Sequence, residues 1–156
     1  MTTCIQTEGC LIELVSSSPE ETAALGERIA SRLRQGSVVA LRGGLGAGKT
    51  CFVKGIARGL GITENVTSPT YTIISEYRGI ISLYHIDAYR LTGDDDFEST
   101  GAGELMSGEG ISVIEWSERI PNSLPPNAII IEIEIRGQEE RLIRIDGSYL
   151  CEALNP

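Results

Sequence analysis

Hydrophobic residues in the first part of the chain follow a helical spacing. Leucine and isoleucine recur every four residues at Leu25, Ile29 and Leu33, which predicts an amphipathic helix with its apolar face on a sheet. Gly36 is the expected end of this helix, because glycine readily adopts the left-handed backbone found at helix C-termini.

The predicted start of this helix has three residues of the capping type. Ser18 can accept a hydrogen bond from a free N–H of the first turn, and Pro19 suits that turn because it has no N–H to leave unpaired. Glu21, three residues after Ser18, can complete a capping box. We therefore expect the helix to begin at Pro19.

A continuous apolar run, Val38 to Leu41, lies between Gly36 and Gly43. Strands that are buried on both faces of a parallel sheet have this pattern. Helical spacing resumes from about Lys49 and ends before Gly61, which predicts a second helix. The positions expected to face inward on that helix are Phe52, Val53, Ile56, Ala57 and Leu60.

Extended segments dominate the second half of the chain. Tyr71 to Tyr77 and Gly79 to Ile86 follow each other so closely that they predict an antiparallel β-hairpin insert. Ile111 to Ile114 has the pattern of another buried strand. Ala128 to Ile135 and Arg141 to Ile145 are expected to pair antiparallel across a turn.

Residues 92–110, between these strands, are rich in glycine, aspartate, glutamate and serine. This composition is typical of loops. We expect a short helix and a mobile loop there, outside the core.

Composition and charge narrow the range of partners. Hydrophobic residues make up 41% and charged residues 22% of the chain, as in ordinary globular proteins that fold unaided. The 13 Lys and Arg against 22 Asp and Glu give a net charge of -9, which opposes unaided binding to a phosphate backbone. Any nucleic acid would then be held by a partner.

The cysteines and the hydropathy indicate the compartment. Cys4, Cys10, Cys51 and Cys151 lack the paired spacing of a zinc site and are interpreted as free thiols. No basic segment with a long apolar run begins the chain, and no 18 apolar residues follow one another. We expect a cytoplasmic protein without membrane contact.

The segment between the first apolar strand and the second helix carries a phosphate-binding pattern. Glycines are needed there because successive backbone N–H groups must curl around a phosphate, and a Cβ would clash or forbid the required dihedral angles. The lysine spans the β- and γ-phosphates, and the hydroxyl of the next residue can bind Mg²⁺. The residues are Gly43, Gly44, Leu45, Gly46, Ala47, Gly48, Lys49 and Thr50.

Such a site also needs a carboxylate at the end of a neighbouring strand, to hold Mg²⁺ or its water. Asp87 follows the run Leu83 to Ile86, and Glu115 follows Ile111 to Ile114, so both qualify. Which of the two is the direct ligand stays open, and either could be a solvated acid at a strand end. ATP is favoured over GTP because nothing resembles the Asn-Lys-x-Asp element that reads guanine.

These elements together predict an α/β fold of the P-loop NTPase class. Its central sheet is expected to be mixed and largely parallel, with the β-hairpin insert, antiparallel C-terminal strands and flanking helices. At 156 residues the chain has the size of one domain, so residues 1–156 are expected to form a single P-loop ATPase domain.

Four motifs in order resemble the TsaE family of small P-loop ATPases over about Pro19 to Ile145. They are Gly44-Leu45-Gly46-Ala47-Gly48-Lys49-Thr50, Ser68-Pro69-Thr70-Tyr71-Thr72, His85-Ile86-Asp87-Ala88-Tyr89-Arg90-Leu91 and Glu115-Trp116. The family acts in bacterial tRNA threonylcarbamoyladenosine biosynthesis, and it supports transfer of a threonylcarbamoyl group to the adenosine beside the tRNA anticodon. The resemblance implies ATP and Mg²⁺ as cofactors. It implies as partners the transferase subunit and its dimerising companion, which would hold the tRNA that this chain is not expected to bind stably alone.

The resemblance also assigns roles to single residues. Lys49 is similar to the phosphate-binding lysine, Thr50 and Glu115 to the Mg²⁺ ligands, and Asp87 to an acid near the γ-phosphate or the metal's water. The catalytic set is therefore expected to be Lys49, Asp87 and Glu115. Residues 68–71 would form a switch-like loop, although a β-turn that opens a strand explains them as well.

Further residues fall near the nucleotide by the same resemblance, each with a structural alternative. Trp116 would lie beside the nucleotide or be a core aromatic, and His85 is interpreted as a core histidine outside the catalytic set. Ser18 lies in an adenine-proximal segment but is also explained by capping. Gly137 opens the segment Gly137 to Arg141, which resembles a family segment near the nucleotide, although a hairpin turn with a solvated charged face explains it equally well. The backbone N–H of Cys51 is expected to point at the α-phosphate. Its side chain departs from the Thr or Ser expected at this position, and a thiol is a weak donor.

Two other functions remain open on the sequence alone. One is a small-molecule or nucleotide kinase, whose lid would fall in residues 92–110, but that segment contains no Lys or Arg. The other is a nucleotide-dependent assembly module with little hydrolysis of its own.

Overall fold

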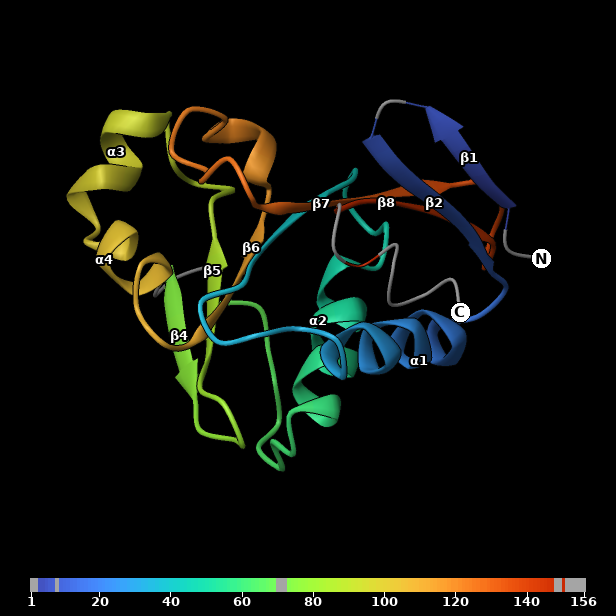
Figure 1. The fold of residues 1–156 in the computed structure, drawn as a ribbon, viewed down its shortest axis with the longest axis horizontal. Coiled ribbons are helices and arrows are strands. Elements are labelled where there is room, and N and C mark those ends of the chain that lie inside the picture. Colours follow the sequence, from blue (N-terminus) through green and yellow to red (C-terminus); the bar gives the residue numbers. More distant parts are fainter. Residues whose placement is uncertain (1–2, 8, 70–72, 148–149, 151–156) are drawn as a thin grey trace.

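The computed structural model describes residues 3–7, 9–69, 73–147 and 150, with side chains from residue 11 onward. Eight strands form one sheet in the order β1-β2-β8-β7-β3-β6-β5-β4 (Figure 1). The strands are β1 (Thr3–Thr7), β2 (Gly9–Ser16), β3 (Val38–Arg42), β4 (Ile74–Tyr77), β5 (Leu83–Asp87), β6 (Ile111–Glu115), β7 (Ile129–Ile135) and β8 (Arg141–Asp146).

The centre of the sheet is parallel and its two sides are antiparallel. β3 pairs in parallel with β6 and β7, and β5 pairs in parallel with β6. β8 pairs antiparallel with β7 and β2, β1 with β2, and β4 with β5. The predicted mixed, largely parallel sheet is confirmed, and the predicted hairpin forms one edge of that sheet.

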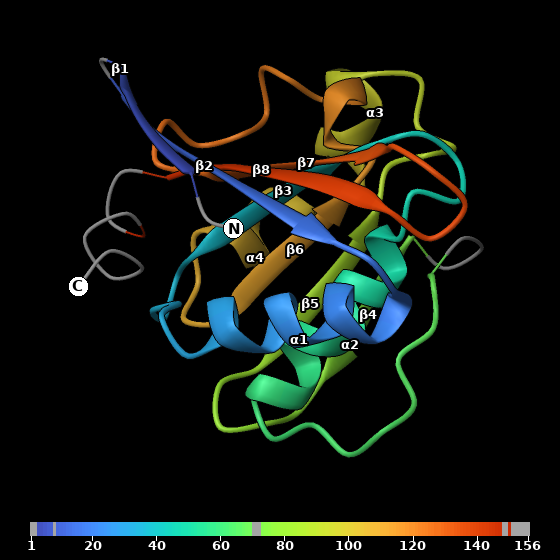
Figure 2. The same cartoon turned by 90° about the vertical axis from the view of Figure 1, so that its right-hand side faces the viewer.

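Helices cover both faces of the sheet. α1 (Pro19–Ala30) and α2 (Lys49–Gly59) lie on one face, and the short helices α3 (Asp94–Ser99) and α4 (Ala102–Met106) lie at the other side (Figure 2). A single 3₁₀ turn, η1 (Ser117–Arg119), follows β6. Because residues alternate along each strand, Val39, Leu41 and Val113 pack on the α2 side, whereas Val38 and Ile114 pack on the α3 side.

Helix α1 begins where the sequence predicts but ends earlier. The Ser18 hydroxyl accepts a 3.1 Å hydrogen bond from the Glu21 N–H, and the Glu21 carboxylate accepts one from Ser17 rather than from Ser18 itself. The helix stops at Ala30, so the expectation that it continues to Gly36 is wrong. Leu33 is buried beyond the helix end, because an apolar side chain can reach the core from the following turns as well.

Helices α1 and α2 approach each other so closely that glycine is required between them. A Cβ on Gly55 of α2 would lie 1.9 Å from the Ala23 carbonyl oxygen, and a Cβ on Gly26 of α1 would lie 2.3 Å from the Phe52 carbonyl oxygen. Backbone thus packs against backbone on this face. The close contact fixes the start of α2, which carries the phosphate-binding motif, relative to α1.

The segment 92–110 contributes to the core, contrary to expectation. It forms α3 and α4, and Phe97 and Ala102 are 1% and 0% exposed among the residues of the second hydrophobic cluster. Composition missed this because a single aromatic residue anchors an otherwise polar segment.

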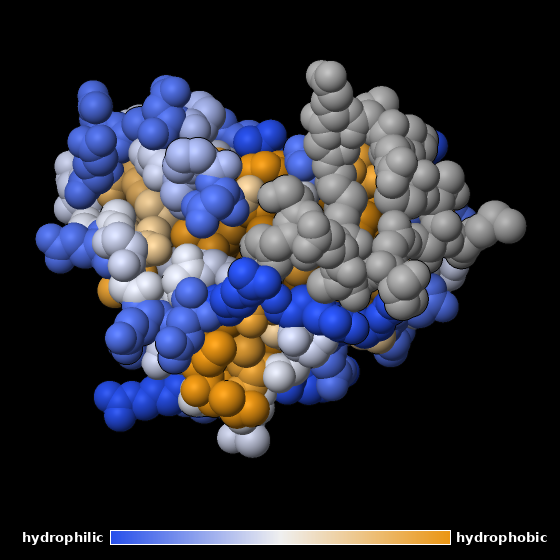
Figure 3. Space-filling view, viewed as in Figure 1, coloured by the Kyte–Doolittle hydropathy of each residue, from blue (hydrophilic) through white to orange (hydrophobic). Residues whose placement is uncertain are grey.

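Three further features of the described residues concern the surface, the cysteines and the character of the helices. Ile80, in the connection from β4 to β5, is 84% exposed. An apolar patch lies at the lower part of the face drawn in Figure 3, beside hydrophilic surface. Cys51 is a free thiol, whereas the side chains of Cys4, Cys10 and Cys151 lie outside the described part. Among the described residues, no helix combines the length and apolar character that crossing a membrane requires.

Candidate functional site

The phosphate-binding motif forms a loop between β3 and the first turn of α2. Gly46 and Gly48 have φ of +75° and +105°, a backbone region that L side chains rarely adopt. A Cβ on Gly46 would meet nothing within 4 Å, so the space around the loop is open. Gly48 directly precedes the helix, which leaves the free N–H groups of the first turn pointing toward this space.

Lys49 is buried at the base of the loop and is held by the loop itself. Its Nζ donates hydrogen bonds of 2.6 and 2.9 Å to the carbonyl oxygens of Gly43 and Gly44. Its Nζ also lies 3.9 Å from the centroid of the Trp116 ring, within range of a cation–π interaction. Burial lowers the pKa of Lys49 from its usual 10.5, while the charges of Glu115, Glu118 and Asp87 act to raise it.

Thr50 and the two strand-end acids meet at one point. The Thr50 Oγ1 donates a hydrogen bond of 3.0 Å to Glu115 Oε1, and Glu115 is paired in register with Asp87 on the neighbouring parallel strand. The two carboxylates are 3% and 6% exposed. Parallel strands end at the same edge of the sheet, so the fold delivers both acids to the loop that follows β3.

Asp87 is bonded to the segment expected to act as a switch. The Ser68 Oγ donates to Asp87 Oδ2 at 3.0 Å, and the Asp87 N–H donates to the carbonyl oxygen of Ile73 at 2.8 Å. The Tyr89 N–H donates to Asp87 Oδ1 at 2.9 Å. Thr70 and Tyr71, also predicted for that loop, lie outside the described residues.

Trp116 has a left-handed backbone, with φ of 59°, immediately after the strand that ends in Glu115. This conformation costs a residue with a Cβ about 1–2 kcal/mol. The Trp116 ring packs at 4.9 Å from the Tyr89 ring, and the Arg119 guanidinium lies 5.1 Å from the Tyr89 centroid. Trp116 is half-buried: it packs against the second hydrophobic cluster and also lines the hollow beside Lys49.

Two hollows share the Gly46 and Gly48 part of the loop. The first, of about 370 Å³, is lined by acids, by Lys49 and by Trp116, with the complete set Leu45, Gly46, Gly48, Lys49, Thr50, Cys51, Ser68, Asp87, Tyr89, Glu115 and Trp116. The second, of about 340 Å³, lies between the start of α1 and the β7–β8 turn and is lined by Pro19, Thr22, Gly46, Ala47, Gly48, Cys51, Gln138, Glu139 and Arg141. Gly46, Gly48 and Cys51 line both, so the loop joins the two.

Three of the residues expected near the nucleotide make hydrogen bonds within the protein. Ser18 caps α1 and is not among the described residues that line the two hollows. Gly137 lies in the β7–β8 turn, where its carbonyl oxygen accepts a hydrogen bond from Arg141. The Cys51 thiol donates a 3.0 Å hydrogen bond to the Pro19 carbonyl oxygen, and burial raises its pKa above 9.0, which keeps the thiol protonated.

Two residues that the sequence analysis left out of the site set contact the site. Arg141 at the start of β8 donates from Nε to the Ala47 carbonyl oxygen at 3.0 Å and from Nη2 to the Gly46 carbonyl oxygen at 3.3 Å. His85 is fully buried and its Nε2 is hydrogen-bonded to Glu115 Oε2. An arginine that opens a strand, and a histidine two residues before a strand-end acid, were the available signals.

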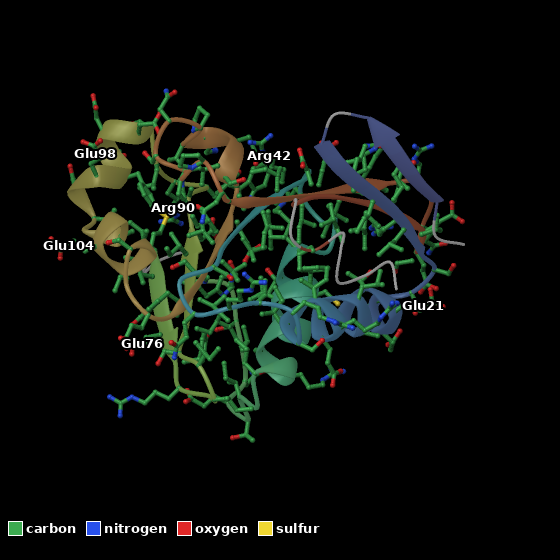
Figure 4. All side chains as sticks on the ribbon, viewed as in Figure 1. Glu21, Arg42, Glu76, Arg90, Glu98 and Glu104 are labelled. Carbon is green, nitrogen blue, oxygen red and sulfur yellow. The ribbon has the colours of Figure 1, made fainter. Side chains whose placement is uncertain are left out.

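The acidic helices α3 and α4 stand apart from the loop. Glu98 and Glu104 project from their outer side, away from the sheet (Figure 4). Asp94 is tied to the segment after η1, because its carboxylate accepts hydrogen bonds from Ser123 and Asn122.

Comparison with known proteins places the chain in a family. The model of "Threonylcarbamoyl adenosine biosynthesis protein TsaE" matches residues 16–143. A TsaE protein from Treponema pallidum is 47% identical over 131 residues, which cover 84% of this chain and 97% of that protein. A TsaE protein from Bacillus subtilis is 43% identical over 144 residues, which cover 88% of this chain and 90% of that protein.

The fold agrees with a solved structure. A crystal structure of Bacillus subtilis YdiB superposes with a TM-score of 0.81 at 37% identity, covering 96% of this chain and 97% of that one. The match of the family model over most of the chain and the agreement of the folds establish that this chain belongs to the TsaE family.

Proposed function

We propose that this chain is the ATP-binding and ATP-hydrolysing subunit of tRNA threonylcarbamoyladenosine biosynthesis. Relatives from Treponema pallidum and Bacillus subtilis are named for that pathway. The observation that carries the biochemical part is the hydrogen bond between Thr50, which follows the phosphate-binding lysine, and Glu115, which ends the adjacent strand. P-loop enzymes use this pair of groups for the metal that accompanies a nucleotide.

The shape and donors around the loop support ATP as the nucleotide. The glycine-rich backbone leaves open space at Gly46, and the start of α2 supplies N–H donors and a partial positive charge. The triphosphate would follow the loop between the two hollows, with its γ-phosphate toward Lys49 and Asp87. The nucleoside would occupy the second hollow, near the start of α1 and the β7–β8 turn that includes Gly137.

The chemistry of the donors supports Mg²⁺. Thr50 and Glu115 offer a hydroxyl and a carboxylate, the hard oxygen ligands that this ion prefers, and Asp87 is placed to bond one of its waters. Magnesium takes few protein ligands, and among the described residues no group of three or more His, Cys, Asp or Glu side chains forms a metal cluster. When bound, Mg²⁺ would neutralise charge on the transferring phosphoryl group.

Lys49 and Asp87 would act on the phosphates directly. Lys49 now bonds two loop carbonyls, and its ammonium would exchange these for the β- and γ-phosphate oxygens. Asp87 would lie near the γ-phosphate and is hydrogen-bonded to Ser68 and to Ile73. A shift of Asp87 on nucleotide binding would therefore change the conformation of the proposed switch loop.

Partners would complete the site. Other P-loop NTPases gain roughly 10³- to 10⁵-fold in rate when an added cation stabilises charge on the γ-phosphate. We propose that the protein acts in the cytoplasm, where the transferase subunit and its dimerising companion close over the first hollow. Hydrolysis of ATP by this chain alone is then slow. The continuous eight-stranded sheet supports one ATPase domain over residues 1–156.

Phosphate release tests the proposal. The rate is measured at saturating ATP and Mg²⁺ for the purified chain, and then with the two partner proteins at saturating concentration. We expect a low rate that rises at least tenfold with the partners, and no rise for Lys49→Ala. Equal rates with and without partners would contradict partner activation, and no phosphate release in either case would favour an assembly module.

A kinase function receives less support from the fold. The segment 92–110, where a lid would fall, is anchored by Phe97 and Ala102 in the second hydrophobic cluster. A lid must open and close over its substrates, and packed core residues oppose that movement.

A further inference from the structure

His85 lies inside the sheet on the same face as the two strand-end acids. It precedes Asp87 by two residues on β5, and in the parallel register it pairs with Val113, two residues before Glu115. Its side chain is 0% exposed. Side chains two residues apart on a strand share a face, so the imidazole lies one step along the sheet from both carboxylates.

The imidazole contacts Glu115 directly. Nε2 is hydrogen-bonded to Glu115 Oε2. With its hydrogen on Nε2, the imidazole donates this bond to the carboxylate. The Glu115 carboxylate is thus held from two sides, by Thr50 at the start of α2 and by His85 on β5.

Packing alone does not explain a histidine at this position. Leu83 on the same strand and Val113 on the next are fully buried apolar residues, and an apolar residue would suit the site of the imidazole as well. The other ring nitrogen, Nδ1, is buried and has no hydrogen-bond partner among the described residues. A buried polar atom without a partner destabilises the fold, so the contribution of His85 lies in the bond to Glu115.

We propose that His85 is a positioning residue, which holds the Glu115 carboxylate in the orientation that binds the magnesium of the metal–nucleotide complex. This inference rests on the Mg²⁺-dependent ATP binding proposed above. Carboxylates that bind metals are commonly held by hydrogen bonds of their own, and loss of such an outer partner typically lowers metal affinity about 10- to 100-fold. Without His85 the carboxylate could rotate toward Thr50 alone.

Two substitutions of similar polarity separate positioning from packing. In His85→Gln the side-chain amide nitrogen can take the place of Nε2 and donate to Glu115. In His85→Asn the shorter side chain places its amide near the Nδ1 position and does not reach Glu115. Leu83→Ala is the control for lost packing, because Leu83 is buried on the same face of the same strand and is not among the described residues that line the first hollow.

The measurement is the affinity for ADP by titration calorimetry, once with Mg²⁺ and once with EDTA, together with the urea midpoint of each variant. The affinity for Mn²⁺ in the presence of ADP is measured separately, from the loss of the free-ion signal in electron paramagnetic resonance. This measurement reports directly on the metal site. We expect His85→Asn to reduce the Mg²⁺-dependent gain in ADP affinity, and the affinity for Mn²⁺, about 10- to 100-fold, with unchanged affinity in EDTA. His85→Gln should retain most of the gain, and Leu83→Ala should lower the urea midpoint but keep the gain.

Two results would overturn the role of His85: an unchanged Mg²⁺-dependent gain in His85→Asn, or an equal loss of affinity in Mg²⁺ and in EDTA. A wild-type chain that binds ADP equally well in Mg²⁺ and in EDTA would overturn the proposed metal site itself. The two failures are thus distinguished by the wild-type measurement. If His85→Asn does not fold, the other two variants decide. Loss of the Mg²⁺-dependent gain in ADP affinity in the folded His85→Gln variant, with the gain retained in Leu83→Ala, would contradict the proposal that His85 acts as a hydrogen-bond donor to Glu115.

Discussion

The hydroxyl of Thr50 donates a 3.0 Å hydrogen bond to Oε1 of Glu115, 65 residues later in the chain. The first residue belongs to the opening turn of α2 and the second ends β6, which lies next to β3 in the sheet. The parallel order of β3 and β6 produces this contact, because both strands end at the same edge. Two oxygen donors of the kind that Mg²⁺ prefers therefore meet beside the phosphate-binding loop.

Replacing Glu115 by Ala should weaken nucleotide binding only when the metal takes part. We expect a loss of ADP affinity of at least tenfold in Mg²⁺ and little change in EDTA, measured by titration calorimetry. Glu104→Ala is the matched control, because this exposed acid projects from α4 away from the sheet (Figure 4). An equal loss in both conditions for Glu115→Ala would count against a metal role.

Lys49→Ala should remove most of the affinity for ATP. Hydrogen bonds from a charged donor contribute roughly 1.5–3 kcal/mol each, which corresponds to a tenfold to hundredfold loss. Lys54→Ala, on the exposed side of the same helix, should bind as wild type does. Calorimetric titration with ATP and Mg²⁺ measures both, and wild-type affinity in Lys49→Ala would refute the role of this lysine.

Gly55→Ala should destabilise the fold through the contact between α1 and α2. The added Cβ would lie 1.9 Å from the Ala23 carbonyl oxygen, which cannot move without its helix. Overpacking of this kind typically costs about 1–3 kcal/mol, and backbone contact places Gly55 at the upper end. Gly103→Ala in α4 is the control, since its Cβ would meet nothing within 4 Å, and it should be neutral or stabilising by up to about 1 kcal/mol. Urea unfolding followed by circular dichroism distinguishes the two.

Asp94 should stabilise the protein in a manner that depends on pH. Hydrogen bonds from Ser123 and Asn122 lower the pKa of Asp94 below its usual 3.8. A carboxyl group with a lowered pKa contributes stability above its unfolded pKa and loses it as the pH falls through the folded one. The difference in urea midpoint between wild type and Asp94→Asn should therefore be present at pH 6 and shrink below pH 3.8. A difference that stays constant over this range would show that ionisation of Asp94 has no part in it.

Local patterns sufficed for the centre of the fold. The apolar run from Val38 and the helical spacing after Lys49 predicted β3 and α2, because both elements are buried and therefore carry an uninterrupted or periodic apolar signal. Asp87 and Glu115 were predicted as strand ends for the same reason. Their proximity in space follows from the parallel pairing of β5 with β6, which the structure shows.

Other features depend on contacts that no local pattern contains. The strands β1 and β2 pair with the far end of the chain through β8, and α3 is fixed by the single residue Phe97. The bonds from His85 to Glu115 and from Arg141 to the carbonyl oxygens of the loop join segments 30 and more residues apart. Such contacts are set by sheet order and register, which a single sequence specifies only weakly.

We propose that nucleotide turnover by this chain supports threonylcarbamoyladenosine formation on tRNA. It is tested most directly in a reconstituted reaction containing the transferase subunit, its dimerising companion, unmodified tRNA, a threonylcarbamoyl donor, ATP and Mg²⁺, with the modified nucleoside quantified by mass spectrometry. We predict sustained formation over many turnovers with the wild-type chain or Lys54→Ala, and little formation with Lys49→Ala or without the chain. Equal amounts of modified nucleoside in all four reactions would contradict the proposed function.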